Sequence, residues 1–99
     1  MAFNTMIGNA PRFWVKFYDE SDQLKDPTIV TFLAGRYEQG PVTIYAWPAD
    51  PEVVKVSTGY FQVTYTLSEP GNIIIRWEGS GAVVATKEDR VIVEDTMLP

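Results

Sequence analysis

Four carboxylates lie close together in the first third of the chain, at Asp19, Glu20, Asp22 and Asp26. Closely spaced carboxylates are the oxygen ligands that a Ca²⁺ loop uses. The segment lacks the central glycine and the distal glutamate of an EF-hand loop, and Lys25 lies inside it. The pattern therefore favours a solvent-exposed loop between strands, and we expect no metal site.

The chain contains few residues suited to catalysis. The chain has no histidine and no cysteine, which excludes imidazole proton transfer, thiol nucleophiles and disulfides. A carboxylate pair for glycoside hydrolysis could be drawn from any of the 13 acidic residues, and no spacing singles out one pair. A single domain of 99 residues also leaves little room for a catalytic cleft. We expect a protein that is not an enzyme, with no catalytic residues and no cofactor.

Charge and hydropathy limit the partners. The formal net charge is −5, and the eight Lys and Arg residues are scattered singly, whereas nucleic-acid binding needs clustered basic residues. No apolar run approaches the roughly 20 residues that span a membrane, and residues 1–9 lack the features of a signal peptide. We therefore expect no nucleic-acid or membrane partner, and assembly inside the cell that makes the protein.

Aromatic residues, 13% of the chain, are the remaining candidates for binding. Several fall on strand faces that we assign to solvent: Trp14, Tyr18, Tyr45, Trp47 and Tyr60. Exposed rings anchor protein interfaces or stack on sugar rings. Alternatively, some of these rings lie under loops, and either face of the strand over 42–47 could be core. The pattern favours a protein interface over a carbohydrate platform.

The elements that must position these residues are strands. Alternating apolar and polar residues predict strands over 12–18, 28–34, 42–47, 60–67, 72–78, 82–86 and 90–94, with a short edge strand over 53–56. The charged run at 87–89 is predicted to be a turn. About seven strands at this spacing, without helical periodicity, are typical of an antiparallel sandwich.

The strands over 60–67 and 72–78 are predicted to form a hairpin. Glu69-Pro70-Gly71-Asn72 between them indicates a type II turn, in which Gly71 supplies the positive φ. Trp77 in the second strand is predicted to lie in the core. Its expected neighbours there are Phe61, Val63, Val15 and Phe32.

A set of short motifs occurs in one order along residues 7–94. The motifs are Gly8, Phe13-x-Val15-x-Phe17, Asp26-Pro27-Thr28-x-Val30, Asp50-Pro51-Glu52-Val53-Val54-Lys55, Ser57-Thr58-Gly59-x-Phe61, Glu69-Pro70-Gly71 and Arg76-Trp77-Glu78-Gly79-x-Gly81. In this order they resemble a group of small proteins of tailed bacteriophages. The sequence departs from that pattern at 35–40, where the group would have a Pro-Asp-Gly turn.

The resemblance implies an immunoglobulin-like sandwich and a place among virion structural proteins, with no catalytic or cofactor residues to carry over. We therefore expect an all-β fold, an immunoglobulin-like antiparallel β-sandwich of about seven strands. The expected function is that of a head decoration, neck or tail accessory subunit, made in the host cytoplasm and located in the virion. Its partners would be capsid, connector or tail proteins and further copies in a homo-oligomer or symmetric array. The alternative is a stand-alone module that binds carbohydrate or a host surface through exposed aromatics.

The two ends of the chain carry apolar residues that have no evident place in the sandwich. We expect an N-terminal arm over 1–9, the sandwich over 10–95 and a C-terminal tail over 96–99, and we expect the arm to extend onto an adjacent subunit. The predicted partner interface consists of Phe3, Met6, Ile7, Trp14, Trp47, Tyr60, Met97 and Leu98.

Overall fold

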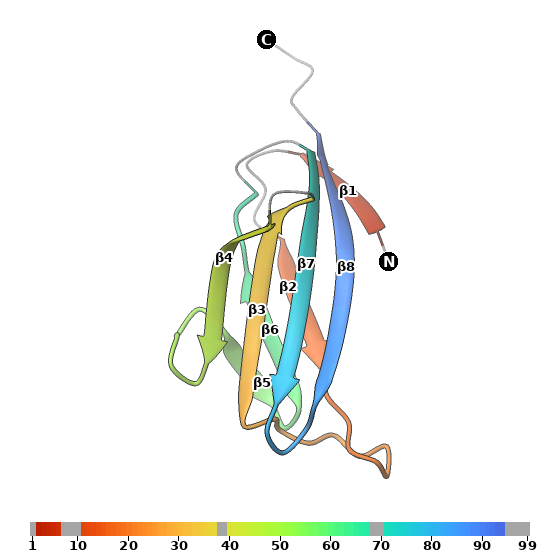
Figure 1. Ribbon diagram of the computed structural model, residues 1–99, viewed down its shortest axis with the longest axis vertical. Helices are drawn as coiled ribbons and strands as arrows, with labels where there is room; N and C mark the ends of the chain where they lie inside the picture. Colours follow the sequence, from red (N-terminus) through yellow and green to blue (C-terminus); the bar gives the residue numbers. More distant parts are fainter. Residues whose placement is uncertain (1, 7–10, 38–39, 68–70, 95–99) are drawn as a thin grey trace.

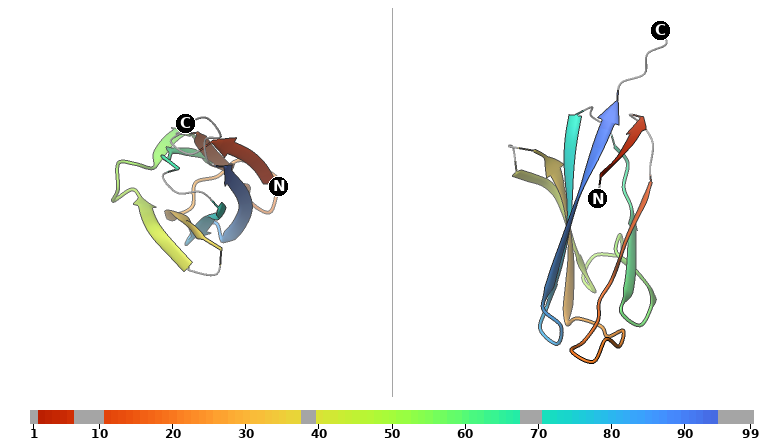
Figure 2. Two further views of the ribbon diagram at one scale, coloured as in Figure 1. Left: turned by 90° about the horizontal axis from the view of Figure 1, so that it is seen from above. Right: turned by 90° about the vertical axis from the view of Figure 1, so that its right-hand side faces the viewer.

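The computed structural model describes residues 2–6, 11–37, 40–67 and 71–94, and these form two packed β-sheets (Figures 1 and 2). The strands are β1 (Ala2–Met6), β2 (Arg12–Lys16), β3 (Ile29–Arg36), β4 (Gly40–Trp47), β5 (Val54–Ser57), β6 (Tyr60–Thr64), β7 (Gly71–Ser80) and β8 (Ala85–Glu94). One sheet has the order β1-β8-β7-β3-β4 and the other β2-β6-β5. Neighbouring strands are antiparallel except β1 and β8, which run parallel.

This architecture confirms the expected immunoglobulin-like sandwich. The chain changes sheets between β1 and β2, between β2 and β3, between β4 and β5, and between β6 and β7. The last three changes resemble the connections between the two sheets of an immunoglobulin-like sandwich. Along β2, β3, β6 and β7 the buried apolar side chains alternate with more exposed ones, because successive side chains point to opposite faces of a strand. The short strand β5 contains only exposed residues.

The core between the sheets is apolar, and no polar or charged side chain is buried among the residues the structure describes. Trp77 lies at its centre with 1% of its surface exposed. Its ring meets Phe32 edge to face, with the ring centroids 5.0 Å apart. The predicted neighbours Phe61, Val63 and Val15 are also buried, so the sequence-based core assignment is confirmed.

The predicted hairpin is wrong, because β6 and β7 belong to different sheets. The apolar faces of the two strands oppose one another across the core instead of lying side by side. Leu67, buried after the end of β6, anchors the connection between the sheets. Gly71 has the expected positive φ, at 124°, whereas residues 68–70 of the predicted turn lie outside the described residues.

The predicted turn at 87–89 is also wrong, since all three residues lie within β8. The pairing with the ten-residue strand β7 continues through them, with Lys87 opposite Trp77 and Glu88 opposite Arg76. Arg76 donates a hydrogen bond to Glu88 across the two strands, so opposite charges stabilise the pair. The chain turns earlier, where Gly81 has a φ of 85°.

The N-terminal segment differs from its expected role as an arm on an adjacent subunit. Ala2–Met6 forms β1 and pairs with β8 of the same chain, with Ala2 opposite Arg90 and Met6 opposite Glu94. Backbone pairing explains the difference, because β8 would otherwise present an unpaired edge. The remainder of the predicted arm and the tail over 96–99 lie outside the described residues, as do Ile7, Met97 and Leu98 of the predicted interface.

Candidate partner-binding surfaces

The outer face of the three-stranded sheet is built by simple alternation along β2. Phe13 and Val15 are buried in the core, so Arg12, Trp14 and Lys16 lie on the opposite side and are exposed. Pairing with β6 places Trp14 opposite Gln62 and Lys16 opposite Tyr60. The two predicted interface residues Trp14 and Tyr60 are thereby brought together on one face.

Two lysine side chains lie close to these rings. Trp14 and Tyr60 meet edge to face with centroids 6.0 Å apart. The Lys16 ammonium lies 5.1 Å from the Tyr60 centroid and 5.8 Å from that of Trp14, and Lys87 from β8 lies 4.9 Å from Trp14. These are cation–π contacts, which favour a positive charge over the ring. We call the surface formed by Arg12, Trp14, Lys16, Tyr60 and Lys87 the basic aromatic face.

Sequence reasoning found the rings of this face but did not assign its charge. The alternation Arg12-x-Trp14-x-Lys16 contains the signal for two of the cations, since residues two apart share a face. Lys87 could not be placed from the sequence, because its contact with Trp14 joins residues distant along the chain and in different sheets.

The acidic cluster is a structured loop between β2 and β3. The Asp19 carboxylate accepts hydrogen bonds from the backbone N–H groups of Ser21 (2.8 Å) and Gln23 (3.0 Å). Asp22 adopts a left-handed φ of 58°, a conformation that aspartate tolerates better than most residues. Asp19 therefore holds the turn. We call residues 19–22 the acidic loop.

Asp26 fixes the base of this loop to the turn between β5 and β6. Its carboxylate accepts hydrogen bonds from the Gly59 backbone N–H at 2.6 Å and from the Lys55 ammonium at 2.5 Å. Burial alone would raise the pKa of Asp26, but the hydrogen bonds and the charge of Lys55 outweigh it and lower the pKa below its ordinary value. The four clustered carboxylates do not converge, and no group of three or more potential ligands in the described part of the chain could hold a metal ion.

A shallow groove separates the acidic loop from the turn between β7 and β8. Its lining consists of Tyr18, Asp19, Glu20, Ser21, Lys25, Gly81, Ala82, Val83 and Val84. The wall formed by the turn between β7 and β8 is held to Thr28, whose hydroxyl accepts a hydrogen bond from Ala82 N–H and whose backbone N–H donates to the Ser80 carbonyl. Val84 is 82% exposed, so this end of the molecule presents acidic and apolar side chains together.

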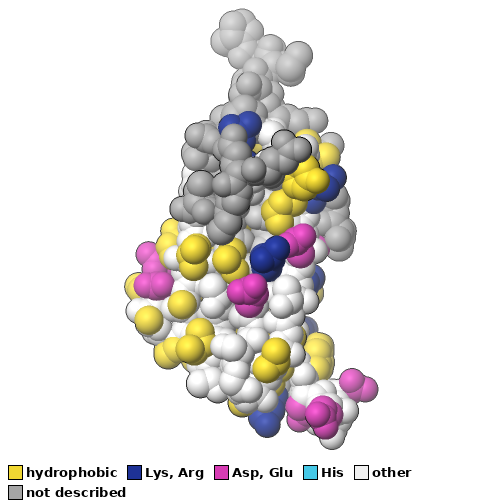
Figure 3. Space-filling view, in the orientation of Figure 1, with side chains coloured by type: hydrophobic (Ala, Val, Ile, Leu, Met, Phe, Trp, Pro, Cys, Tyr) yellow, Lys and Arg dark blue, Asp and Glu magenta, His cyan; other side chains and the backbone are white. Residues whose placement is uncertain are grey.

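The outer face of the five-stranded sheet carries aliphatic side chains. Leu33 on β3 pairs with Ile44 on β4, and Ile44 is 56% exposed. Ile29 is exposed as well, while Leu33 and Ile74 are half-buried. Figure 3 shows hydrophobic side chains distributed over this side of the molecule. We call the surface formed by Ile29, Leu33, Ile44 and Ile74 the apolar sheet face.

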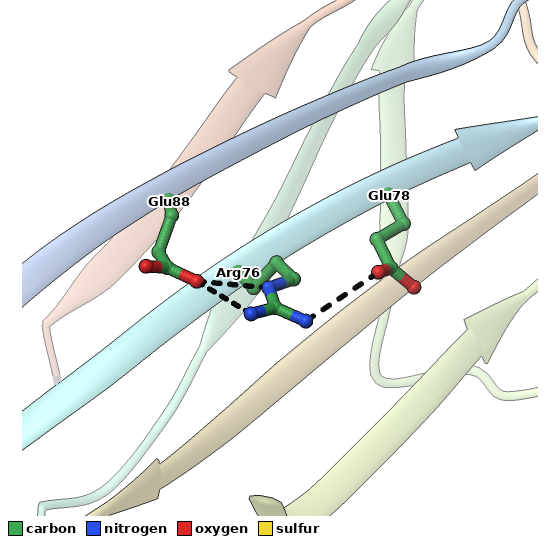
Figure 4. A network of polar contacts seen from close by, with 3 residues as sticks. All are labelled: Arg76, Glu78 and Glu88. Atoms are coloured by element: carbon green, nitrogen blue, oxygen red, sulfur yellow. Dashed lines mark hydrogen bonds and ion pairs between the residues drawn. The ribbon is translucent and has the colours of Figure 1, made fainter. Parts of the chain in front are cut away.

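An ion-pair network lies beside the apolar sheet face, on β7 and β8 (Figure 4). Arg76 donates hydrogen bonds from Nε and Nη2 to one Glu88 oxygen, at 2.9 and 2.7 Å, and its Nη1 lies 3.8 Å from Glu78. The hydrogen bonding and charge of Glu88 raise the pKa of Arg76. Exposed pairs of this kind add little stability, but here they satisfy the charges next to the aliphatic residues.

The assignment of Tyr45 and Trp47 to a solvent face is wrong. Both are half-buried and pack against the core, with the Trp47 ring edge to face on Phe61 at 4.9 Å and Tyr45 stacked on Phe32 at 6.3 Å. Their register explains this, since Tyr45 lies opposite the buried Phe32 of β3. Trp47 is thus separate from the Trp14 and Tyr60 pair, and its role in an interface stays a prediction.

The described backbone places Phe3 and Met6 in β1, opposite Val91 and Glu94. The structure describes the backbone of these two residues but not their side chains, so their contact with a partner stays a prediction.

No family model matches this chain, and no curated protein matches it. Among solved structures, the chain is similar to the crystal structure of the ZIG-8 IG1 homodimer, with a TM-score of 0.49 and 14% sequence identity. The match covers 96% of this chain and 79% of the other. Among the described residues there is no helix long and apolar enough to cross a membrane.

Proposed function

We propose that this protein is a non-enzymatic structural protein of a bacteriophage virion. It binds other virion proteins as a head decoration, neck or tail accessory subunit. The observation that carries the binding role is the apolar sheet face, where Ile44 and Ile29 expose about half of their surfaces on a regular sheet. The ordered motifs shared with small proteins of tailed bacteriophages support the virion setting.

Exposed aliphatic residues on one sheet face favour a protein partner. Fully burying one such side chain contributes about 1.5–3 kcal/mol, and a sheet presents it with little conformational entropy left to lose. The Arg76, Glu78 and Glu88 network keeps neighbouring charges paired, so a partner could cover the face without isolating a charge.

A symmetric particle would strengthen such contacts. Each copy needs only modest affinity when many copies bind equivalent sites on one particle. Once one contact forms, the neighbouring binding sites are present at a high effective concentration, so the contacts together bind more tightly than each would alone. The net charge of −5 would keep the free subunit soluble before assembly.

Capture experiments with extracts of infected cells test this proposal. Purified tagged protein should retain an identified capsid, connector or tail protein, and Ile44→Arg should abolish that capture by placing a charge in the interface. Val56→Arg is the matched control, because Val56 is comparably exposed at 46% but lies on β5 of the other sheet. Failure of the native protein to retain any virion protein, or equal capture by both variants, would contradict the proposal.

The second candidate function is recognition of carbohydrate or a host surface. It is favoured by the half-exposed rings of Trp14 and Tyr18. The ammonium groups of Lys16 and Lys87 already lie over the Trp14 ring, which leaves less of it for a sugar to stack on. Binding on a glycan array that is lost in Trp14→Ala would support this candidate instead.

A further inference from the structure

We propose that the basic aromatic face binds the acidic loop of a second copy of this chain, so that copies join head to tail. This inference deepens the proposed function, and it rests on the symmetric array that such a function implies. It identifies one contact from which the array is built.

The charges of the molecule are segregated in a way that its composition does not suggest. The chain has 13 acidic and eight basic residues, yet β2, β5 and β6 contain Arg12, Lys16 and Lys55 and no acidic residue. Lys55 is paired with Asp26, and Lys87 of the basic aromatic face lies 3.9 Å from an Asp89 carboxylate oxygen. Arg12 and Lys16 make no ion pair within the described part of the chain, so their charges remain available to an acidic partner.

The acidic loop has the complementary chemistry. Glu20 and Asp22 are exposed and make no ion pair among the described residues. The Asp19 hydrogen bonds hold the loop in one conformation, which reduces the entropy lost on binding. Leu24 and Val84, 41% and 82% exposed, add apolar surface near the loop that suits the Trp14 and Tyr60 rings.

The two surfaces lie on different parts of the molecule. The acidic loop joins β2 to β3 at the lower end of the sandwich in Figure 1, whereas the basic aromatic face is on the outer side of the three-stranded sheet. A contact between them must therefore join different copies, with the face of one subunit on the loop of the next. Such heterologous contacts generate rings or open chains.

The contact is expected to be weak in solution. Strands of five residues at about 3.3 Å per residue, spaced by about 4.8 Å, give a face of roughly 16 by 10 Å. That is well below the roughly 800 Å² per partner of a standard interface. We expect a Kd on the order of 0.1–1 mM at low salt, weakening strongly as salt screens the charges.

Sedimentation velocity on purified protein, over a concentration series reaching about 1 mM, tests the inference with two neutralised variants. The face variant is Arg12→Gln with Lys16→Gln, and the loop variant is Glu20→Gln with Asp22→Asn. All four side chains are exposed, so both variants should keep the native melting temperature. The native protein should associate in a salt-sensitive way, while each variant alone should remain monomeric.

Mixing the two variants gives the deciding result. The face variant retains its acidic loop and the loop variant retains its basic face, so the mixture should form a 1:1 dimer that cannot grow further. The control Glu52→Gln with Arg90→Gln neutralises one charge of each sign elsewhere and should associate as the native protein does.

A native protein that stays monomeric at low salt would overturn the inference, as would variants that associate normally or a mixture without the dimer. These outcomes leave the proposed function separately testable, because capture of virion proteins through the apolar sheet face does not require self-association.

Discussion

The two outer sheet faces of this sandwich differ in how their charged side chains are partnered. On the five-stranded sheet, Arg76 is paired with Glu78 and Glu88, so aliphatic residues lie among satisfied charges. On the three-stranded sheet, Lys16 faces only the rings of Trp14 and Tyr60. The first face suits an apolar partner and should bind almost independently of salt. The second suits an acidic partner and should be salt-sensitive.

The largest expected effect is the loss of stability when a side chain is removed from the core that lies beneath both faces. Trp77→Ala should lower the free energy of unfolding by about 3–5 kcal/mol, a large part of the roughly 5–15 kcal/mol of a typical domain. Trp14→Ala, which removes the same side chain from the surface, should change stability far less. Denaturant unfolding followed by circular dichroism measures both, and equal losses would refute the assignment of the two tryptophans.

The next effect should distinguish the two sheets. Gly59 has a φ of 71°, and a Cβ there would lie 2.8 Å from Phe17 O and Lys25 N. Gly59→Ala should therefore destabilise the protein by more than the roughly 1 kcal/mol of an unfavourable φ alone. The disturbance should be confined largely to β5, β6 and the acidic loop.

Amide hydrogen exchange reports where the disturbance falls. Protection should drop around Phe17 and Gly59, whose backbones are hydrogen bonded, and persist in β3 and β7. Ser57→Ala, at an exposed position of the same hairpin, is the control. Uniform loss of protection in both sheets would contradict a local role for Gly59.

The sequence predicts the features that depend on neighbouring residues and not those that depend on residues far apart along the chain. Alternation predicts that Val15 and Trp77 face the core while Trp14 faces outward, because a side chain's direction in a strand is a local property. It does not predict which strands pair, so the hairpin that the sequence predicts for β6 and β7 is instead a connection between the two sheets. The pairing of β1 with β8 and the contact of Lys87 with Trp14 also depend on non-local packing that no short motif encodes.

A smaller effect concerns the pH dependence of the loop anchor. Because the folded-state pKa of Asp26 lies below its unfolded value of about 3.9, its ionised form stabilises the fold. That contribution is fully present above the unfolded pKa and is lost as pH falls through the folded pKa.

Asp26→Asn should therefore cost about 1 kcal/mol near neutral pH and less in acid. Thermal unfolding between about pH 6 and pH 2 measures the difference. Asp22→Asn is the control, because it removes an exposed carboxylate that does not hold the loop to Gly59 and Lys55 as Asp26 does. A stability gap between native and Asp26→Asn protein that stays constant with pH would contradict this role of the Asp26 carboxylate.

The most direct test of the central claim is quantitative mass spectrometry of purified phage particles. Three phages would be compared, encoding the native protein, Ile44→Arg or Val56→Arg. We predict that native and Val56→Arg proteins are present at a fixed number of copies per particle, while Ile44→Arg protein is made but left out. Particles that lack the native protein, or that incorporate all three equally, would contradict a structural role through the apolar sheet face.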